Sequence, residues 1–171
     1  ATLELPKPLA TPARIPAPST WPASTELDAL KLLPKIHWYS GMQETWRPGE
    51  HGAMQHLDRF LDTSVANYGE TRNLPAQSGT SRLSPHLHFG EISPRQIWHT
   101  AAKWRSSQFM AEIGWREFAH HLLYHFPRTT NEPLRLEYQK FPWRDDAKQL
   151  HAWQRGRTGV PLVDAGMREL W

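Results

Sequence analysis

The chain of 171 residues carries 20 lysines and arginines against 17 aspartates and glutamates, so its net charge at pH 7 is +3 with ten neutral histidines. This is the length of one domain, and no apolar run approaches the roughly 18 residues of a membrane-spanning helix, so we expect a soluble protein without membrane contact. The absence of cysteine excludes disulfides, thiolate metal sites and a cysteine nucleophile, and it fits the reducing cytoplasm, which is our expected location.

Proline dominates the start of the chain, and residues 1–45 are therefore expected to form an extended interdomain connector. Each proline removes a backbone donor and disfavours helix at the residue before it. The expectation rests on Pro6, Pro8, Pro12, Pro16, Pro18, Pro22 and Pro34. Because a connector joins two parts, we also expect a further domain ahead of it.

Helical patterns begin after Pro48. Residues 51–68 carry apolar side chains at three- and four-residue steps, which predicts one amphipathic helix. The side chains of that stripe are Met54, Leu57, Leu61, Val65 and Tyr68. A second helix start is expected at Ser84, and a third at Ser93, where Pro94 and Gln96 complete the pattern of a capping box.

The longest helical pattern covers 107–126 and ends at Pro127. Its expected buried side chains are Phe109, Ile113, Phe118, Leu122 and Phe126. A short helix capped by Asp145 or Asp146 should stop at Gly156, and a last helix should begin near Pro161. Within it, Asp164 and Arg168 are spaced to pair. The fold class is therefore mainly α, with residues 46–171 as the helical domain.

The loop at residues 79–85 has the composition of an anion site. Thr80, Ser81 and Ser84 supply hydroxyls and Arg82 supplies a guanidinium, ahead of a helix start whose N–H groups are unpaired. A phosphate would fit there. A plain capped turn explains the same residues, and from this segment alone it is the stronger interpretation.

A second constellation lies at residues 112–118. Helical spacing places Glu112, Trp115 and Arg116 on neighbouring turns, so a carboxylate, an indole and a guanidinium could share a cavity. Gly114 inside this helix suggests that something packs close to its backbone. The alternative is a surface ion pair between Glu112 and Arg116 beside a core tryptophan, and spacing alone does not separate the two.

Other classes of site find little support. The histidines at 86, 88, 120, 121 and 125 lack an H-E-x-x-H pattern, so we favour packing roles and predict no metal site. No G-x-S-x-G elbow, dinucleotide fingerprint or P-loop is present. The positive charge permits nucleic-acid binding, but the basic residues are scattered.

Longer motifs resemble a known family. Residues 80–95, TSRLSPHLHFGEISPR, look like the flavin loop of the DNA photolyase and cryptochrome family, and residues 112–118, EIGWREF, resemble its substrate-cavity helix. The stretches at 153–159 and 161–168 follow in the family's order. The resemblance covers roughly 46–171 and is closest to photolyases of cyclobutane pyrimidine dimers.

The resemblance implies a folded-back, noncovalent FAD inside a helical domain. By motif position, the residues expected to bind FAD are Tyr68, Thr80, Ser81, Arg82, Leu83, Ser84 and Arg116. It also implies damaged DNA as the partner, with Arg72, Glu112, Trp115 and Arg116 facing it. Trp143 aligns with the outer tryptophan of an electron-transfer chain, although without the family an ordinary surface anchor is the preferred interpretation.

The implied reaction is light-driven splitting of the dimer by an electron from reduced FAD, in a parent protein expected to be monomeric. The family's antenna-chromophore domain and its later flavin motif are absent, so we interpret the chain as the first part of a flavin domain, truncated at its C-terminus and inactive alone. A cryptochrome-type photoreceptor and a flavin-free helical DNA-binding module are the alternatives. An absorption spectrum separates the latter from both flavoproteins.

Overall fold

The computed structural model describes residues 5–104 and 106–170, and within these residues all regular structure is helical. The α-helices are α1 (Ser40–Thr45), α2 (Glu50–Thr63), α3 (Tyr68–Thr71), α4 (Ser84–His88), α5 (Pro94–Ala101), α6 (Ser107–His125), α7 (Ala147–Gln154) and α8 (Pro161–Leu170). Short 3₁₀ turns are η1 (Leu27–Leu30), η2 (Val65–Asn67), η3 (Ala102–Trp104), η4 (Pro127–Thr130) and η5 (Leu136–Lys140). The mainly α fold class is confirmed. None of the described helices combines the length and apolar character needed to cross a bilayer.

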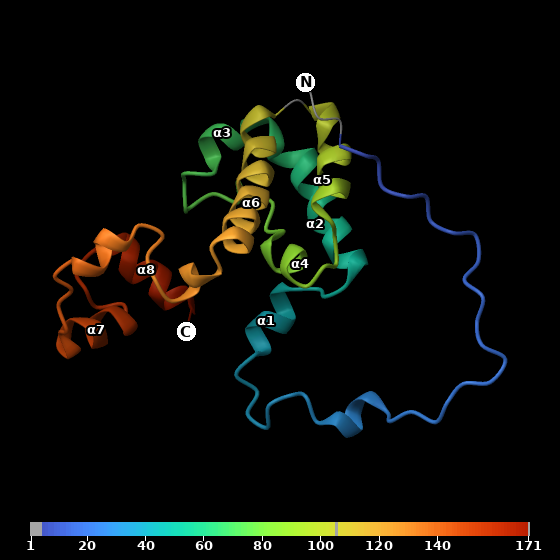
Figure 1. Ribbon diagram of the computed structural model, residues 1–171, viewed down its shortest axis with the longest axis horizontal. Helices are drawn as coiled ribbons and strands as arrows, with labels where there is room; N and C mark the ends of the chain where they lie inside the picture. The colour runs from blue at the N-terminus through green and yellow to red at the C-terminus, as the bar shows by residue number, and fades with distance from the viewer. Residues whose placement is uncertain (1–4, 105, 171) are drawn as a thin grey trace. The chain divides into compact units, whose positions relative to one another are not determined.

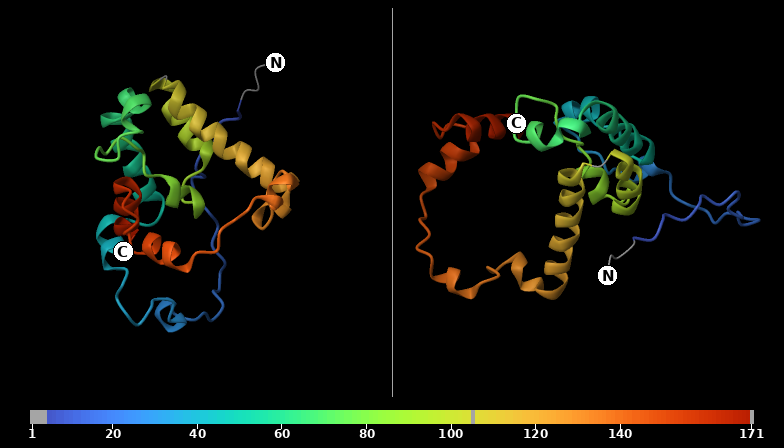
Figure 2. Two further views of the ribbon diagram at one scale, coloured as in Figure 1. Left: turned by 90° about the vertical axis from the view of Figure 1, so that its left-hand side faces the viewer. Right: turned by 90° about the horizontal axis from the view of Figure 1, so that it is seen from above.

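The described residues fall into two compact units, one up to His120 and one from His121 onward. In the first unit, residues 5–39 run as an exposed, extended segment interrupted by η1 (Figures 1 and 2), whereas residues 40–45 of the expected connector form α1. Residues beyond α1 then form the helices that position the site.

The core of the first unit lies between α2, α5 and the first half of α6 (Figure 1). Three aromatic rings meet there: the centroid of Phe60 lies 4.7 Å from that of Phe109 and 5.5 Å from that of Tyr68. The last two rings are 5.4 Å apart. Offset and edge-on ring contacts of this kind fix the mutual placement of helices as well as burying area. α2, α3 and α6 are thus tied together directly beside the candidate site.

The expected single helix over 51–68 is interrupted. α2 ends at Thr63, and η2 and α3 follow as separate turns. The hydroxyl of Thr63 donates a 2.8 Å hydrogen bond to the carbonyl of Arg59, and Ser64 leaves helical geometry at φ −128°. Side chains that bond back to the helix compete with its ladder, which is why the apolar stripe continues while the helix does not.

The capping predictions at Ser93 and Asp146 are confirmed, whereas the N-cap residue of α4 is Leu83 and no side chain caps that helix. The hydroxyl of Ser93 accepts from the N–H of Gln96, whose side chain accepts from the N–H of Ser93. In the second unit, Asp146 accepts from the N–H of Gln149 at 3.0 Å, and α7 is followed by Gly156 at φ +58°. Each of these caps depends on residues within one helical turn, so the local sequence is sufficient to predict it.

The predicted pair between Asp164 and Arg168 is wrong. Asp164 is buried, and its carboxylate accepts two 2.7 Å hydrogen bonds from the N–H and hydroxyl of Thr158 and a third from the N–H of Gly159. Arg168 donates to the carbonyl of Gly156 instead. The carboxylate closes the loop that precedes α8, and the hydrogen bond from the Thr158 hydroxyl is the main reason that the pKa of Asp164 is lowered.

Two further expectations for α6 are wrong. Phe118 and Phe126 are exposed and Leu122 is half-buried, because a stripe at 118, 122 and 126 lies around the helix from the buried pair Phe109 and Ile113. A Cβ added at Gly114 would meet no atom within 4 Å in the described chain, so no close packing at that glycine is present.

Candidate functional site

A hollow of about 510 Å³ lies where α3, the loop before α4, α4 and α6 meet. Six of its lining residues are predicted site residues: Tyr68, Ser81, Leu83, Ser84, Glu112 and Arg116. The other lining residues are Leu87, His88, Phe109, Ile113 and His120. One wall is therefore a polar loop and a short helix, and the other is a single face of α6.

The loop is held in place by a glycine and by a buried leucine. A Cβ at Gly79 would lie 2.5 Å from the side chain of Thr71, so only glycine lets the loop approach the end of α3 this closely. Leu83 is 2% exposed and anchors the other end in the core. Between them Arg82 adopts the left-handed conformation at φ +53°. Within the described residues the backbone N–H groups of Ser81, Arg82 and Leu83 donate no hydrogen bond.

Ser81 also lines a smaller hollow of about 270 Å³, together with Thr80 and Arg82. The remaining lining residues of this smaller hollow are His56, Arg59, Phe60, Thr63, Ser64 and Ser78. The five predicted loop residues are thus divided between two neighbouring hollows, with Ser81 at both.

An ion pair joins two elements that are distant in sequence. The Nη1 of Arg72, which follows α3, donates to Oε1 of Glu112 on α6, and the same oxygen accepts from Nε2 of Gln108 at 2.9 Å. The hydrogen bond from Arg72 is the main cause that lowers the pKa of Glu112. Nearby, burial raises the pKa of the Tyr68 hydroxyl. Glu112 is therefore an ionised hydrogen-bond acceptor at neutral pH.

The surface ion pair between Glu112 and Arg116 that the spacing allowed is not formed. Arg116 donates to the neighbouring Glu117 at 2.5 Å, while Glu112 is engaged by Arg72. Arg116 is only partly exposed and lines the hollow, so a guanidinium is available to a ligand there.

Trp115 does not line the hollow that contains Glu112 and Arg116. Its side chain is 63% exposed and touches the ring of Phe118, with centroids 5.8 Å apart. At 100° per residue, Trp115 lies about 110° around α6 from the middle of the lining face. The hollow is therefore lined by the Glu112 carboxylate and the Arg116 guanidinium, whereas the Trp115 indole lies outside it on the adjoining surface of α6.

Trp143 lies in the second unit, before α7. It is 81% exposed, and its ring contacts that of Phe141 at 4.7 Å.

Five lining residues were missed from the sequence, although a usable pattern was present. Phe109, Ile113, Arg116 and His120 recur at steps of four, three and four, which marks one helix face. His88 lies one turn beyond Ser84 on α4. Once Glu112 and Arg116 are placed in a site, this spacing assigns their neighbours to the same wall.

A cluster behind the loop was also missed. His86 is 2% exposed, and its Nδ1 lies 2.5 Å from a carboxylate oxygen of Glu91. Its ring lies 5.2 Å from that of His56 and 6.0 Å from that of Trp46, and its Nε2 has no hydrogen-bond partner in the described chain. The described residues contain no group of three metal-ligating side chains, and His86 instead joins α4 to Glu91.

The chain resembles known proteins over most of its length. Residues 109–171 match the family model described as the FAD binding domain of DNA photolyase. A deoxyribodipyrimidine photo-lyase of Agrobacterium fabrum is 47% identical over 169 residues, which cover 94% of this chain and 35% of that protein. Cryptochrome-2 of Arabidopsis thaliana is 34% identical over 174 residues, which cover 94% of this chain and 28% of that protein.

A solved structure agrees with these matches. The crystal structure of a bacterial class III photolyase from Agrobacterium tumefaciens superposes with a TM-score of 0.81 at 46% identity, covering 91% of this chain and 34% of that one. The chain thus spans about a third of the length of these photolyases.

Proposed function

We propose that this chain, which belongs to the DNA photolyase and cryptochrome family, forms part of the flavin-binding domain of a light-driven carbon–carbon lyase that repairs cyclobutane pyrimidine dimers. The observation that carries the proposal is the hollow itself. It brings the loop residues Ser81 and Ser84 together with Glu112 and Arg116 from α6.

The residues present fit FAD. The unpaired N–H groups of Ser81, Arg82 and Leu83, with the hydroxyls of Ser81 and Ser84, are donors suited to a pyrophosphate. Arg116 adds a cation. Bound FAD, when reduced, supplies light-driven one-electron chemistry to such a site. Tyr68 and Thr80 complete the proposed set of FAD-binding residues.

We assign the DNA-facing role to α6 and to Arg72. The ionised carboxylate of Glu112, fixed by Arg72, is placed to accept a hydrogen bond from a base edge. The exposed indole of Trp115 offers a face on which a damaged base pair can stack once it leaves the duplex. Arg72 and Arg116 supply positive charge for backbone phosphates. The exposed Trp143 is proposed to pass electrons toward the flavin.

The test is dimer repair by the complete photolyase of which this chain is proposed to form part, because the chain by itself is expected to be inactive. The complete protein is illuminated with single-stranded DNA that contains a dimer, and repaired product is measured beside the flavin absorption spectrum. Trp115→Ala should lower repair at least tenfold while leaving bound flavin unchanged, because it removes only the stacking surface. Tyr124→Ala, which removes another exposed aromatic side chain of α6, should leave repair intact.

Unchanged repair in Trp115→Ala would remove the role of that indole. A protein whose spectrum shows no flavin would remove the cofactor proposal altogether.

A cryptochrome-type photoreceptor is the second candidate, since plant cryptochromes are among the relatives at 34% identity. Such a protein would retain flavin and respond to light without repairing the dimer. Bound flavin with no repair by the unmodified protein would therefore favour it.

The proposed photolyase acts as a monomer in the cytoplasm, and light scattering of the purified protein checks its oligomeric state.

A further inference from the structure

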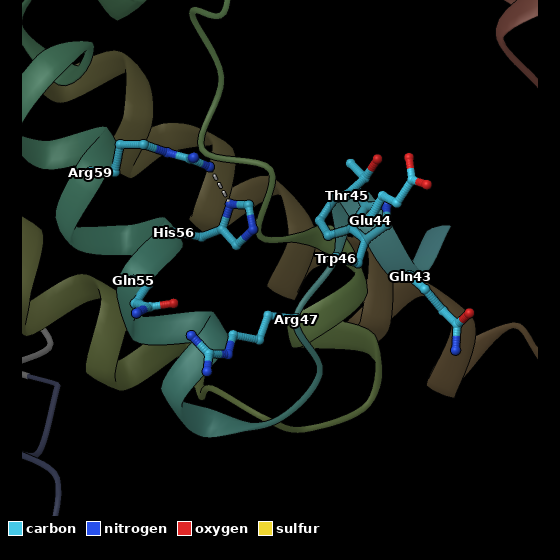
Figure 3. A pocket seen from close by; sticks show the side chains of 8 residues that line it. All are labelled: Gln43, Glu44, Thr45, Trp46, Arg47, Gln55, His56 and Arg59. Atoms are coloured by element: carbon cyan, nitrogen blue, oxygen red, sulfur yellow. Dashed lines mark hydrogen bonds between the residues drawn. The ribbon is translucent and has the colours of Figure 1, made fainter. Parts of the chain in front are cut away.

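A separate hollow of about 390 Å³ lies between α1, the turn that follows it, and α2 (Figure 3). Its lining residues are Gln43, Glu44, Thr45, Trp46, Arg47, Gln55, His56 and Arg59. None of these lines the hollow of Glu112 and Arg116. His56 and Arg59 also line the smaller hollow of Thr80, Ser81 and Arg82, but none of the residues proposed to bind FAD or DNA lines this one.

The charge on its walls is mainly positive. Arg47 and Arg59 both line the hollow, and neither forms an ion pair in the described part of the chain. Figure 3 shows their guanidinium groups on opposite sides of the His56 ring. Glu44 is the carboxylate of this wall, and in the same view its oxygens point away from His56. Two guanidinium groups facing one space without carboxylate partners favour an anionic ligand.

His56 adds a directed donor. It is 8% exposed, and its Nδ1 lies 2.8 Å from Nη2 of Arg59. Because a guanidinium only donates, this Nδ1 is the acceptor, and the proton of the neutral ring sits on Nε2. Burial, followed by the charges of Arg59, His86 and Arg82, lowers the pKa of His56, so the ring is neutral at pH 7. No hydrogen bond occupies Nε2 among the described residues, which leaves its N–H for a ligand.

The walls are fixed before any ligand arrives. The ring of Trp46 lies 5.4 Å from that of His56, and the guanidinium of Arg82 lies 4.6 Å from the Trp46 centroid. At the other rim, a Cβ at Gly52 would lie 1.8 Å from the carbonyl oxygen of Arg47, so glycine is required for α2 to hold that segment. Rigid donors lose little freedom on binding, which favours affinity.

We propose that this hollow binds a phosphate group through Arg47, Arg59 and the Nε2–H of His56. Guanidinium groups match phosphate oxygens in bidentate geometry, and the amides of Gln43 and Gln55 can supply further donors. A stacked base is not part of the site, because Trp46 already contacts His56 and Arg82 through its ring. The same phosphate chemistry can come from a small phosphorylated molecule or from the backbone of DNA.

Calorimetric titration of the purified protein at constant ionic strength tests the proposal. One arm uses inorganic pyrophosphate and the other an undamaged single-stranded oligonucleotide. Arg47→Gln and Arg59→Gln should each raise the Kd of the bound probe at least tenfold. Arg95→Gln, on an exposed arginine of α5 outside all described hollows, should not change it.

Loss of pyrophosphate binding in the two variants supports the site with a small-molecule source, and loss confined to the oligonucleotide supports it with DNA as the source. Absence of saturable binding of either probe to the unmodified protein would overturn it, as would equal weakening in Arg95→Gln. Flavin content should be unchanged in Arg47→Gln, so failure here is distinguishable from failure of the flavin proposal.

Discussion

The guanidinium carbon of Arg82 lies 4.6 Å from the ring centroid of Trp46, and the backbone of Arg82 is left-handed at φ +53°. A non-glycine residue in this conformation is strained and persists only where its surroundings hold it. The Trp46 ring provides such support from the side of the loop that faces α1 and α2. Trp46, which lies outside the flavin-loop motif, therefore helps to hold the loop at residues 79–83 in this conformation.

Replacing Trp46 should therefore loosen the loop. Trp46→Leu is expected to lower the free energy of unfolding by roughly 2–4 kcal/mol, through lost ring contacts and a cavity. Trp46→Phe, which retains a π-face, should lose less than half of that. Urea unfolding of both variants, with bound flavin measured by absorbance, checks the prediction. Trp21→Leu, on a side chain that is 73% exposed, is the control.

The pair of Arg72 and Glu112 should make stability depend on pH. Because the pKa of Glu112 in the folded protein lies below its ordinary value of 4.5, the folded state favours the carboxylate. This stabilisation is present above the ordinary value and is lost as pH falls through the lowered pKa. Urea midpoints measured from about pH 6 down to about pH 3 should fall less steeply in Glu112→Gln than in the unmodified protein. Glu70→Gln, an exposed glutamate of α3, should keep the full slope.

The capping box of α5 should contribute measurably. Ser93→Ala is expected to lower the free energy of unfolding by about 1 kcal/mol, because the N–H of Gln96 loses its acceptor. Gln96→Ala removes the reciprocal bond, and the double variant should cost less than the sum of the two. Strictly additive losses in this cycle would contradict a cooperative box.

Two glycines near α8 should respond in opposite directions. At Gly156 an alanine Cβ would lie 2.8 Å from the carbonyl oxygen of Asp164, at φ +58°, so Gly156→Ala should destabilise by about 1–3 kcal/mol. Gly166 lies within α8 with open space at its Cβ position, and Gly166→Ala should stabilise by up to about 1 kcal/mol. Chemical unfolding of the two variants gives both signs in one experiment.

Local features of the fold were predictable from sequence, whereas long-range pairings were not. The Ser93 cap, the Asp146 cap and the stop at Gly156 depend on residues within one turn. The partner of Glu112 is forty residues away in sequence, and helical spacing offered Arg116 in its place. Asp164 bonds to Thr158 and does not pair with Arg168, because a buried carboxylate is stabilised more by several short hydrogen bonds than by one exposed ion pair.

For the candidate site, the motifs identified which residues take part but not which of their side chains line the hollow. The spacing of Glu112, Trp115 and Arg116 put them on adjacent turns, yet only the first and last line the hollow. Which side of α6 faces the loop is decided by the packing of Phe109 against Phe60 and Tyr68, a contact between three separate elements. Trp46 and His56 carry no motif, and only the folded chain brings them to His86.

The contact between Gly79 and Thr71 leaves no gap for a side chain between them. Movement of the loop toward α3 would compress atoms that are already in contact, so the edge of the hollow lined by Ser81 and Tyr68 resists narrowing. A ligand that enters beside Ser81 and Tyr68 therefore meets an edge that cannot close further around it.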